Sequence, residues 1–174
     1  MMKRKLKLFI STMCLLAVIT SCGKDKEEVD QRLANKENKE AGELFLEKNA
    51  GEQGVLQTSK GLQYKKVVDN KDSKIKPYLE DTVNVTYTGK MIDDKIFVSA
   101  TDEDLLLVTQ IEGFQDGLQL MTEGSTYIFY IPYCLAYSAS SKTVSYDGKA
   151  VTVKPYSALI FEVTLNSVKR KTWD

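Results

Sequence analysis

Cys22 is the residue whose surroundings point most directly to a chemical modification. It follows Ile19-Thr20-Ser21, so small or β-branched residues come just before a thiol. This arrangement resembles the signals that direct acylation of a cysteine and cleavage of the chain before it. Each acyl CH₂ buried in a bilayer contributes about 0.8 kcal/mol, and several acyl chains on Cys22 would therefore anchor the protein firmly. The alternative is a leader cleaved at a small-residue site, with Cys22 carrying no lipid.

The segment before Cys22 has the layout of a secretory signal peptide. A basic head, Lys3–Lys7, precedes an apolar run from Leu8 to Ile19 that is too short for a helix to cross a hydrocarbon core of roughly 30 Å. We therefore expect residues 1–21 to be a signal peptide and residues 22–40 to be a lipid-anchored flexible tether. The protein would then be exported and attached to a bacterial membrane, the outer membrane facing the periplasm or the cell surface. The acidic stretch Lys24–Glu28 is typical of a solvated spacer, and it is also similar to tags that send some Gram-negative lipoproteins to the surface.

The composition excludes several kinds of site. Removal of the leader leaves 20 basic residues against 24 acidic ones, a net charge of −4, so no basic footprint for nucleic acid is expected and membrane attachment should depend on the lipid. The chain has no histidine, and Cys134 is the only thiol outside the leader and the lipidation site. Zinc sites and histidine-dependent triads are therefore excluded, and we expect no metal or cofactor. Cys134 lies in an apolar stretch and is predicted to be buried.

The pattern of hydrophobic and polar residues in the rest of the chain predicts the strands and the helix that would position a functional site. Hydrophobic and polar residues alternate over 83–87 and, apart from Ile160, over 159–165, which is typical of half-buried strands. Asp147-Gly148 predicts a hairpin within Thr143–Val153, and the apolar spacing of Phe114–Met121 predicts a short helix. The sequence thus predicts an α+β fold, a twisted antiparallel sheet of five to six strands wrapped around one short helix. Residues 41–57 are predicted to form a short helix and a linker.

Several strings, read in order, resemble the FKBP-type peptidyl-prolyl cis-trans isomerases, in the macrophage infectivity potentiator-like branch. The strings are Gly42–Asn49, Ser59–Tyr64, Val85–Gly89 with Phe97, Gly113–Met121, Phe129–Pro132 with Leu135–Tyr137, and Leu159–Val163. The resemblance implies an FKBP-like domain over residues 58–172. It also implies peptidyl-prolyl cis-trans isomerase activity on proline-containing polypeptides, such as newly exported chains. Rotation about the peptide bond has a barrier of roughly 18–20 kcal/mol. The reaction breaks no bond and moves no proton, so it needs neither histidine nor metal.

By this resemblance, six residues would form the site. Phe114 would be the floor of an aromatic pocket, with Tyr87, Phe97 and Phe161 as its walls. The Ile111 backbone N–H and the Tyr137 hydroxyl would hold substrate carbonyls. A dry aromatic pocket can bind the twisted amide better than the planar one, and this difference is what accelerates rotation. Ordinary core packing is the alternative for each aromatic residue, except Tyr137, which is predicted to lie in a loop.

Four features of this chain depart from the family pattern, and those near the pocket leave a second function open. Val98 stands where the family has an aspartate that polarises and braces the pocket, and Gln110-Ile111 replaces a Val-Ile pair. The loop that is usually rich in glycine and proline is replaced by residues 138–156. The long dimerising helix of this branch is predicted to be missing, so we expect a monomer. The alternative to a weak isomerase is a non-catalytic peptide- or protein-binding module on the same scaffold.

Overall fold

A computed structural model describes residues 6–172, and it describes the side chains of residues 26–172. The chain divides into two compact parts, one ending at Glu37 and the other beginning at Asn38. Among the residues whose side chains are described, the buried hydrophobic core lies entirely in the second part, between Leu62 and Leu165. Residues 38–174 therefore carry a complete core of their own.

The first element corrects the prediction for residues 22–40. Helix α1 runs from Leu6 to Asn49, so the segment expected to be a flexible tether is helical, and the helix predicted to start near residue 41 begins much earlier. The stretch 24–41 has no glycine or proline and consists mostly of good helix formers. Ion pairs one turn apart, Glu28 with Arg32 and Lys39 with Glu43, stabilise it further. The expectation of a monomer rested on a missing long helix and so loses its support.

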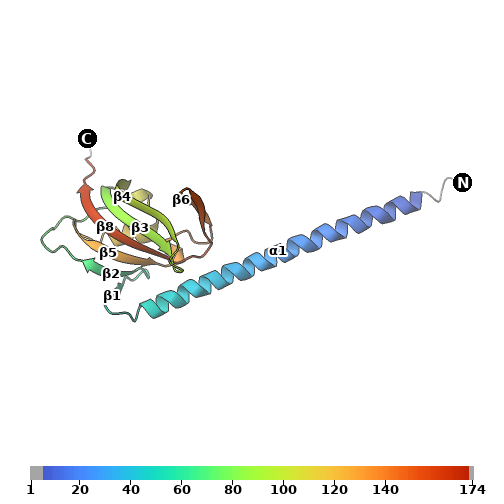
Figure 1. Ribbon diagram of the computed structural model, residues 1–174, viewed down its shortest axis with the longest axis horizontal. Coiled ribbons are helices and arrows are strands. Elements are labelled where there is room, and N and C mark those ends of the chain that lie inside the picture. The colour runs from blue at the N-terminus through green and yellow to red at the C-terminus, as the bar shows by residue number, and fades with distance from the viewer. Residues whose placement is uncertain (1–5, 173–174) are drawn as a thin grey trace. The chain divides into compact units, whose positions relative to one another are not determined.

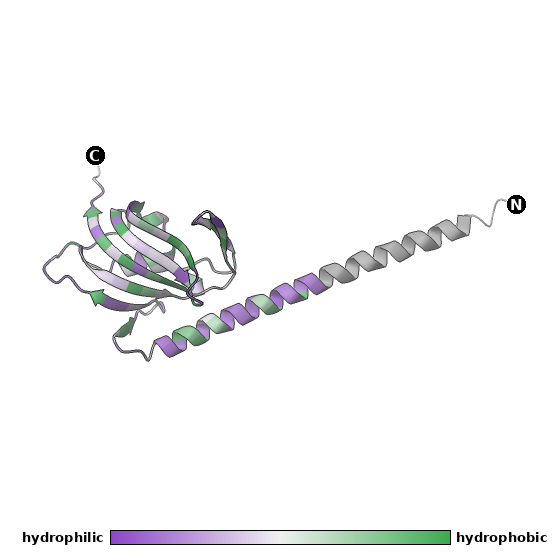
Figure 2. Cartoon of the chain, in the orientation of Figure 1, coloured by the Kyte–Doolittle hydropathy of each residue, from purple (hydrophilic) through white to green (hydrophobic). Residues whose placement is uncertain are grey.

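The proposed modification site lies outside the described side chains. Cys22 and the predicted signal peptide fall in the stretch of α1 and its N-terminal flank whose side chains the structure does not describe. Within the described residues, no helix combines the length and the apolar character needed to span a membrane. The part of α1 that is coloured in Figure 2 is largely hydrophilic.

Six strands form one antiparallel sheet, and this confirms the predicted fold class (Figure 1). The order across the sheet is β1-β2-β5-β8-β3-β4. The strands are β1 (Val55–Gln57), β2 (Gln63–Val68), β3 (Thr82–Met91), β4 (Ile96–Leu106), β5 (Thr126–Ile131) and β8 (Leu159–Lys169). The 3₁₀ turn η1 (Leu107–Thr109) and helix α2 (Glu112–Leu118) connect β4 to β5. Figure 2 shows hydrophobic and hydrophilic residues alternating along the strands, as expected for a sheet with one face on a core.

Helix α2 lies close to β5 because two of its residues are glycines. A Cβ at Gly117 would lie 2.7 Å from the Phe129 ring, and a Cβ at Gly113 would lie 2.3 Å from Ile131 Cγ2. Both distances are far shorter than any real Cβ contact, so larger residues could not occupy these positions without moving the helix. This close approach fixes the height of α2 above the sheet, and with it the position of Phe114.

The predicted hairpin is confirmed as a separate two-stranded ribbon. Strands β6 (Lys142–Tyr146) and β7 (Lys149–Val153) pair antiparallel across Asp147 and Gly148, whose φ angles are 51° and 70°. Two successive positive φ values are those of a tight hairpin turn, which explains the Asp-Gly pair. Figure 1 shows the ribbon beside the main sheet.

Cys134 corrects another prediction, since its side chain is exposed rather than buried. Pro132 ends β5, and residues Tyr133–Leu135 form the 3₁₀ turn η2 instead of extending the strand. The alternation that would have placed Cys134 inside therefore stops at Ile131, and Leu135 becomes the buried residue of the turn.

Candidate functional site

One small pocket brings together all six residues that the sequence singled out. Its volume is about 110 Å³, and it is lined by Tyr87, Phe97, Val98, Leu105, Gln110, Ile111, Phe114, Tyr137, Val144 and Phe161. Val98, Ile111, Tyr137 and Val144 are only half buried, so the pocket opens to solvent. A hole of this size suits one ring-sized apolar group rather than a large ligand.

The site is assembled from elements that are distant in sequence. The three adjacent strands β3, β4 and β8 contribute Tyr87, Phe97 and Phe161, respectively. Ile111 is the residue that caps the N-terminus of α2, and Phe114 lies in the first turn of that helix. Tyr137 follows η2. The sheet and the helix therefore fix the aromatic walls, and the loop after η2 adds a hydroxyl.

Phe161 lies at the centre of an aromatic cluster. Its ring centroid is 5.2 Å from that of Phe114, 5.6 Å from that of Phe97 and 6.3 Å from that of Tyr87. The Phe97 and Phe161 rings are nearly perpendicular, at 89°, which is a favourable edge-to-face arrangement. Phe97, Phe114 and Phe161 are each less than 5% exposed, and Phe114 also packs edge-on against Phe129. The pocket is therefore the exposed rim of the hydrophobic core.

Gly89 leaves the space that the Phe161 ring occupies. A Cβ at this position would lie 2.5 Å from Phe161 Cε1 and 2.7 Å from Val98 Cγ1. Gly89 pairs with Phe161 on β8 and with Val98 on β4, so it is the backbone floor between two residues that line the pocket. The absence of a side chain at residue 89 is thus a requirement of the pocket.

The Tyr87 hydroxyl is held by a carboxylate from the neighbouring strand. It donates a 2.8 Å hydrogen bond to Glu103 Oε2. The pairing of β3 with β4 shifts register between Val85 and Tyr87, because β4 carries an extra residue there, and Asp102 takes a φ of 53°. The Asp102 N–H donates to Thr86 Oγ1, and its carboxylate accepts a bond from the Asn166 side chain. This braced bulge redirects β4 so that Glu103 reaches Tyr87.

Burial, then the hydrogen bond to Glu103 and the charge of that carboxylate, raise the pKa of Tyr87 well above its ordinary value. We expect Glu103→Ala to lower kcat/KM for an X–Pro peptide about fivefold, the equivalent of one hydrogen bond, because the Tyr87 ring loses its anchor. It should also lower the pKa of Tyr87 partway, as measured by ring-carbon NMR during a pH titration. Glu103→Gln keeps an acceptor and should retain most of the activity. Equal losses in both variants would contradict a positioning role for this bond.

Two hydrogen-bond donors at the pocket have no partner in the described part of the chain. The Ile111 carbonyl accepts bonds from Phe114 and Gln115, but the Ile111 N–H has no acceptor there. The Tyr137 hydroxyl likewise makes no hydrogen bond with a described residue, and burial raises the pKa of this phenol. Both groups stay protonated near neutral pH. They are therefore able to donate to the carbonyl oxygens of a bound peptide.

Sequence reasoning missed three residues of this region. Leu105 and Val144 line the pocket, and Glu103 holds Tyr87. Gln110, which departs from the family pattern, also lines the pocket. Val144 could have been suspected, because it lies on the strand of the predicted hairpin and the hairpin replaces a loop of the family pattern. Glu103 gave no signal, since only the bulge brings it to Tyr87. Val98 lines the pocket, so the side chain at this position is apolar and supplies no carboxylate.

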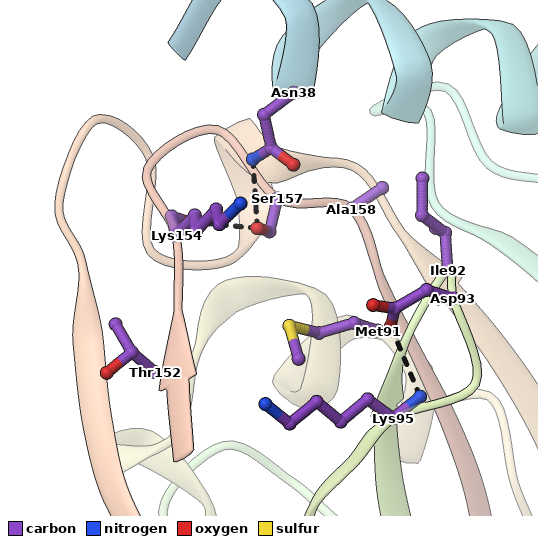
Figure 3. A pocket seen from close by; sticks show the side chains of 9 residues that line it. All are labelled: Asn38, Met91, Ile92, Asp93, Lys95, Thr152, Lys154, Ser157 and Ala158. Atoms are coloured by element: carbon purple, nitrogen blue, oxygen red, sulfur yellow. Dashed lines mark hydrogen bonds between the residues drawn. The ribbon is translucent and has the colours of Figure 1, made fainter. Parts of the chain in front are cut away.

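A second and larger cavity, of about 400 Å³, lies near the end of the β3–β4 hairpin (Figure 3). Polar and aliphatic side chains line it: Asn38, Met91, Ile92, Asp93, Lys95, Thr152, Lys154, Ser157 and Ala158. Asn38 donates to Ser157 Oγ and to the Pro155 carbonyl, so part of this lining holds the end of α1 on the domain. None of its lining residues is aromatic, and the aromatic pocket is therefore the better candidate for recognising a proline ring.

Comparison with protein families gives two adjoining matches. Residues 73–166 match the model described as FKBP-type peptidyl-prolyl cis-trans isomerase. Residues 3–65 match the model described as the domain amino terminal to FKBP-type peptidyl-prolyl isomerase. The second match corrects the prediction that the helical region ahead of the domain is missing, in agreement with the length of α1.

Individual relatives agree with the family matches. A probable FKBP-type peptidyl-prolyl cis-trans isomerase FkpA of Neisseria meningitidis is 37% identical over 134 residues, which are 75% of this chain and 46% of that protein. The macrophage infectivity potentiator of Trypanosoma cruzi is 31% identical over 166 residues, 93% of this chain and 79% of that protein. The crystal structure of FkpA from Escherichia coli superposes with a TM-score of 0.75 at 29% identity, covering 91% of this chain and 71% of that one. The chain thus spans only about half of the length of the Neisseria relative.

Proposed function

This chain belongs to the family of FKBP-type peptidyl-prolyl cis-trans isomerases, and from that premise we propose that it catalyses rotation about X–Pro bonds in exported polypeptides. Uncatalysed rotation takes tens of seconds and can limit folding, so a protein that meets unfolded chains outside the cytoplasm has a use for this activity. The proposed site residues are Tyr87, Phe97, Ile111, Phe114, Tyr137 and Phe161.

The observation that supports the proposal is the shape and chemistry of the aromatic pocket. Its volume of about 110 Å³ and its aromatic walls suit a proline ring. The unpartnered Ile111 N–H and Tyr137 hydroxyl could hold the carbonyls that flank the ring. An amide that twists loses resonance and charge separation, and an apolar pocket stabilises that state relative to the planar amide. These residues do so by shape and exclusion of water, without a proton transfer.

A binding module without turnover is the second candidate, and Val98 is the observation that favours it. An isopropyl group lines the pocket where the family has a carboxylate. Glu103, on the same strand as Val98, supplies a carboxylate to Tyr87, but its side chain is exposed and does not line the pocket. Under this alternative the pocket and the Val144 side of the hairpin would hold a peptide segment and release it unchanged.

We further propose that the chain is exported, and that a lipid on Cys22 attaches it to the outer membrane. The sequence before and around Cys22 supports this proposal. A relative of Legionella longbeachae, 38% identical over 138 residues, bears the name outer membrane protein MIP. Labelling cells with a radioactive fatty acid and comparing wild type with Cys22→Ser tests it. Label that remains on the Cys22→Ser protein would contradict lipidation at this residue.

The test of activity is the cis–trans relaxation rate of a short X–Pro peptide with residues 38–174. We expect acceleration by the wild type, and its loss by about tenfold or more in Phe114→Ala, which removes the pocket floor. Tyr137→Phe should cost about fivefold, the equivalent of one hydrogen bond. Val98→Asp discriminates the two candidates, because it should raise the rate of a weak isomerase and leave a pure binding module without turnover. Circular dichroism must show that each variant is folded.

A further inference from the structure

A second group of charged residues lies outside the aromatic pocket, at the loop between β2 and β3. A cavity of about 380 Å³ there is lined by Lys66, Asp69, Asn70, Lys71, Ser73, Lys74, Lys76, Leu120, Thr122 and Tyr127. Four lysines thus converge on one opening that has a single carboxylate. We propose that this surface, the basic loop, binds the phosphate headgroups of an anionic membrane.

The charge of the cavity is largely uncompensated. Asp69 is already engaged, since it pairs with Lys66 at 3.1 Å and accepts the Tyr127 hydroxyl at 2.8 Å. Lys71 and Lys76 make no ion pair with any described residue, and the Lys74 ammonium donates only to the Lys71 carbonyl. The other exposed carboxylates of the loop, Asp72 and Glu80, do not line the cavity. Three ammonium groups therefore remain available to anions.

Exposed apolar side chains beside these lysines favour a membrane over a soluble anion. Ile75 stands between Lys74 and Lys76 and is 45% exposed, and Tyr78 is 65% exposed. Val67 and Val68 are also about half exposed, at the end of β2 where the loop begins. Lysines that alternate with apolar and aromatic residues are typical of segments that lie in a lipid interface, where headgroups take the charges and the acyl boundary takes the apolar groups.

The loop is held in a defined conformation, so these residues are presented together. Pro77 is buried, and the Ile75 carbonyl accepts a bond from the Glu123 N–H. Asn70 donates to the Glu123 carbonyl, and the Arg170 guanidinium packs over the Tyr78 ring at 4.3 Å and donates to the Lys76 carbonyl. Because these contacts already fix the backbone of the loop, binding to a membrane need not order it first. The loss of conformational entropy that opposes binding is therefore small.

The position of the basic loop is compatible with the proposed activity. The aromatic pocket includes Ile111 at the N-terminus of α2, whereas the lining of the basic loop includes Leu120 beyond the C-terminus of that helix. A seven-residue helix alone separates them by about 10 Å. In Figure 1 the segment after β2 projects from the sheet on the side away from the β6–β7 hairpin, whose Val144 lines the pocket. A domain resting on a membrane through the basic loop would therefore leave the pocket open.

Vesicle co-sedimentation with residues 38–174 tests this inference, because that part has its own core and lacks Cys22 and most of α1. The vesicles are phosphatidylcholine alone, and phosphatidylcholine mixed equally with phosphatidylglycerol. We expect binding to the anionic vesicles only, and a decrease as salt is added. The double variant Lys74→Glu with Lys76→Glu should weaken it about thirtyfold, since each lysine near an anionic surface contributes about a factor of five.

The matched control reverses two lysines elsewhere. Lys142→Glu with Lys149→Glu changes the net charge equally, but these residues lie on the β6–β7 hairpin. We expect this variant to bind nearly as wild type, and Ile75→Ser to weaken binding even at high salt. No binding of the wild type to anionic vesicles would overturn the inference, and so would an equal loss in both double variants, which would indicate attraction by net charge. None of these readouts depends on isomerase activity.

Discussion

Gly89→Ala should reduce isomerisation of an X–Pro peptide by at least about tenfold. A methyl group at this position would come within 2.5 Å of Phe161 and 2.7 Å of Val98, and both residues line the pocket. The Phe161 ring must then rotate or shift, and displacements of about 1 Å at a reacting site can cost a hundredfold in rate. The strain should also lower the free energy of unfolding by about 1–3 kcal/mol. The measurement is kcat/KM with urea unfolding in parallel.

The control for this prediction is another glycine. Gly51→Ala adds a methyl group whose nearest neighbour is the Lys48 carbonyl oxygen at 3.5 Å, an ordinary contact. This variant should keep full activity and wild-type stability. If Gly89→Ala were as active as Gly51→Ala, the Phe161 ring would not need its observed position, and the pocket described above would not be the functional one.

The second large effect is expected for Gly117→Ala. Replacing glycine by alanine in a helix usually stabilises a protein, but here we expect it to destabilise the protein. Glycine to alanine in an exposed helix interior stabilises a protein by about 1 kcal/mol. At Gly117 the new methyl group would meet the Phe129 ring at 2.7 Å, and Phe129 is fully buried between α2 and the sheet. Overpacking of this kind costs about 1–3 kcal/mol, so Gly117→Ala should lower the free energy of unfolding.

The same variant should also reduce activity, since α2 carries Phe114 one turn before Gly117. Raising the helix from β5 moves the pocket floor and separates Phe114 from Phe129, which it contacts at a centroid distance of 6.2 Å. Thermal unfolding and the peptide assay measure the two effects, again with Gly51→Ala as reference. A rise in Tm with unchanged turnover would show that α2 has more room than the structure indicates.

The sheet could be predicted from sequence because its determinants are local, whereas most residues of the pocket are implied only by the resemblance to the family. Alternation over residues 83–87 and 159–165 places Tyr87 and Phe161 on the inner face, and the ordered strings of the family place Phe97, Ile111, Phe114 and Tyr137. Glu103 could not be predicted, because its approach to Tyr87 depends on an extra residue in β4 and on the positive φ of Asp102. A bulge changes which side chains face each other, and no alternation pattern encodes that change.

The error in the N-terminal region has a different cause. A polar segment with little to bury has the composition both of a flexible tether and of a solvated helix. The small number of hydrophobic residues in segment 22–40 predicts a flexible tether. Helix propensity and the paired charges of Glu28 and Arg32 instead favour the helix that is observed. For such segments, intrinsic propensity was the better guide than hydrophobicity.

The most direct test of isomerase activity is two-dimensional exchange NMR on an X–Pro peptide with a small amount of residues 38–174. We expect exchange peaks between the cis and trans proline signals on a subsecond timescale, where the free peptide takes tens of seconds. We also expect Phe114→Ala to abolish these peaks. If the peptide signals shift on binding but no exchange peaks form, the pocket holds proline without turning it over. The protein would then be a binding module, and the proposed isomerase activity would be wrong.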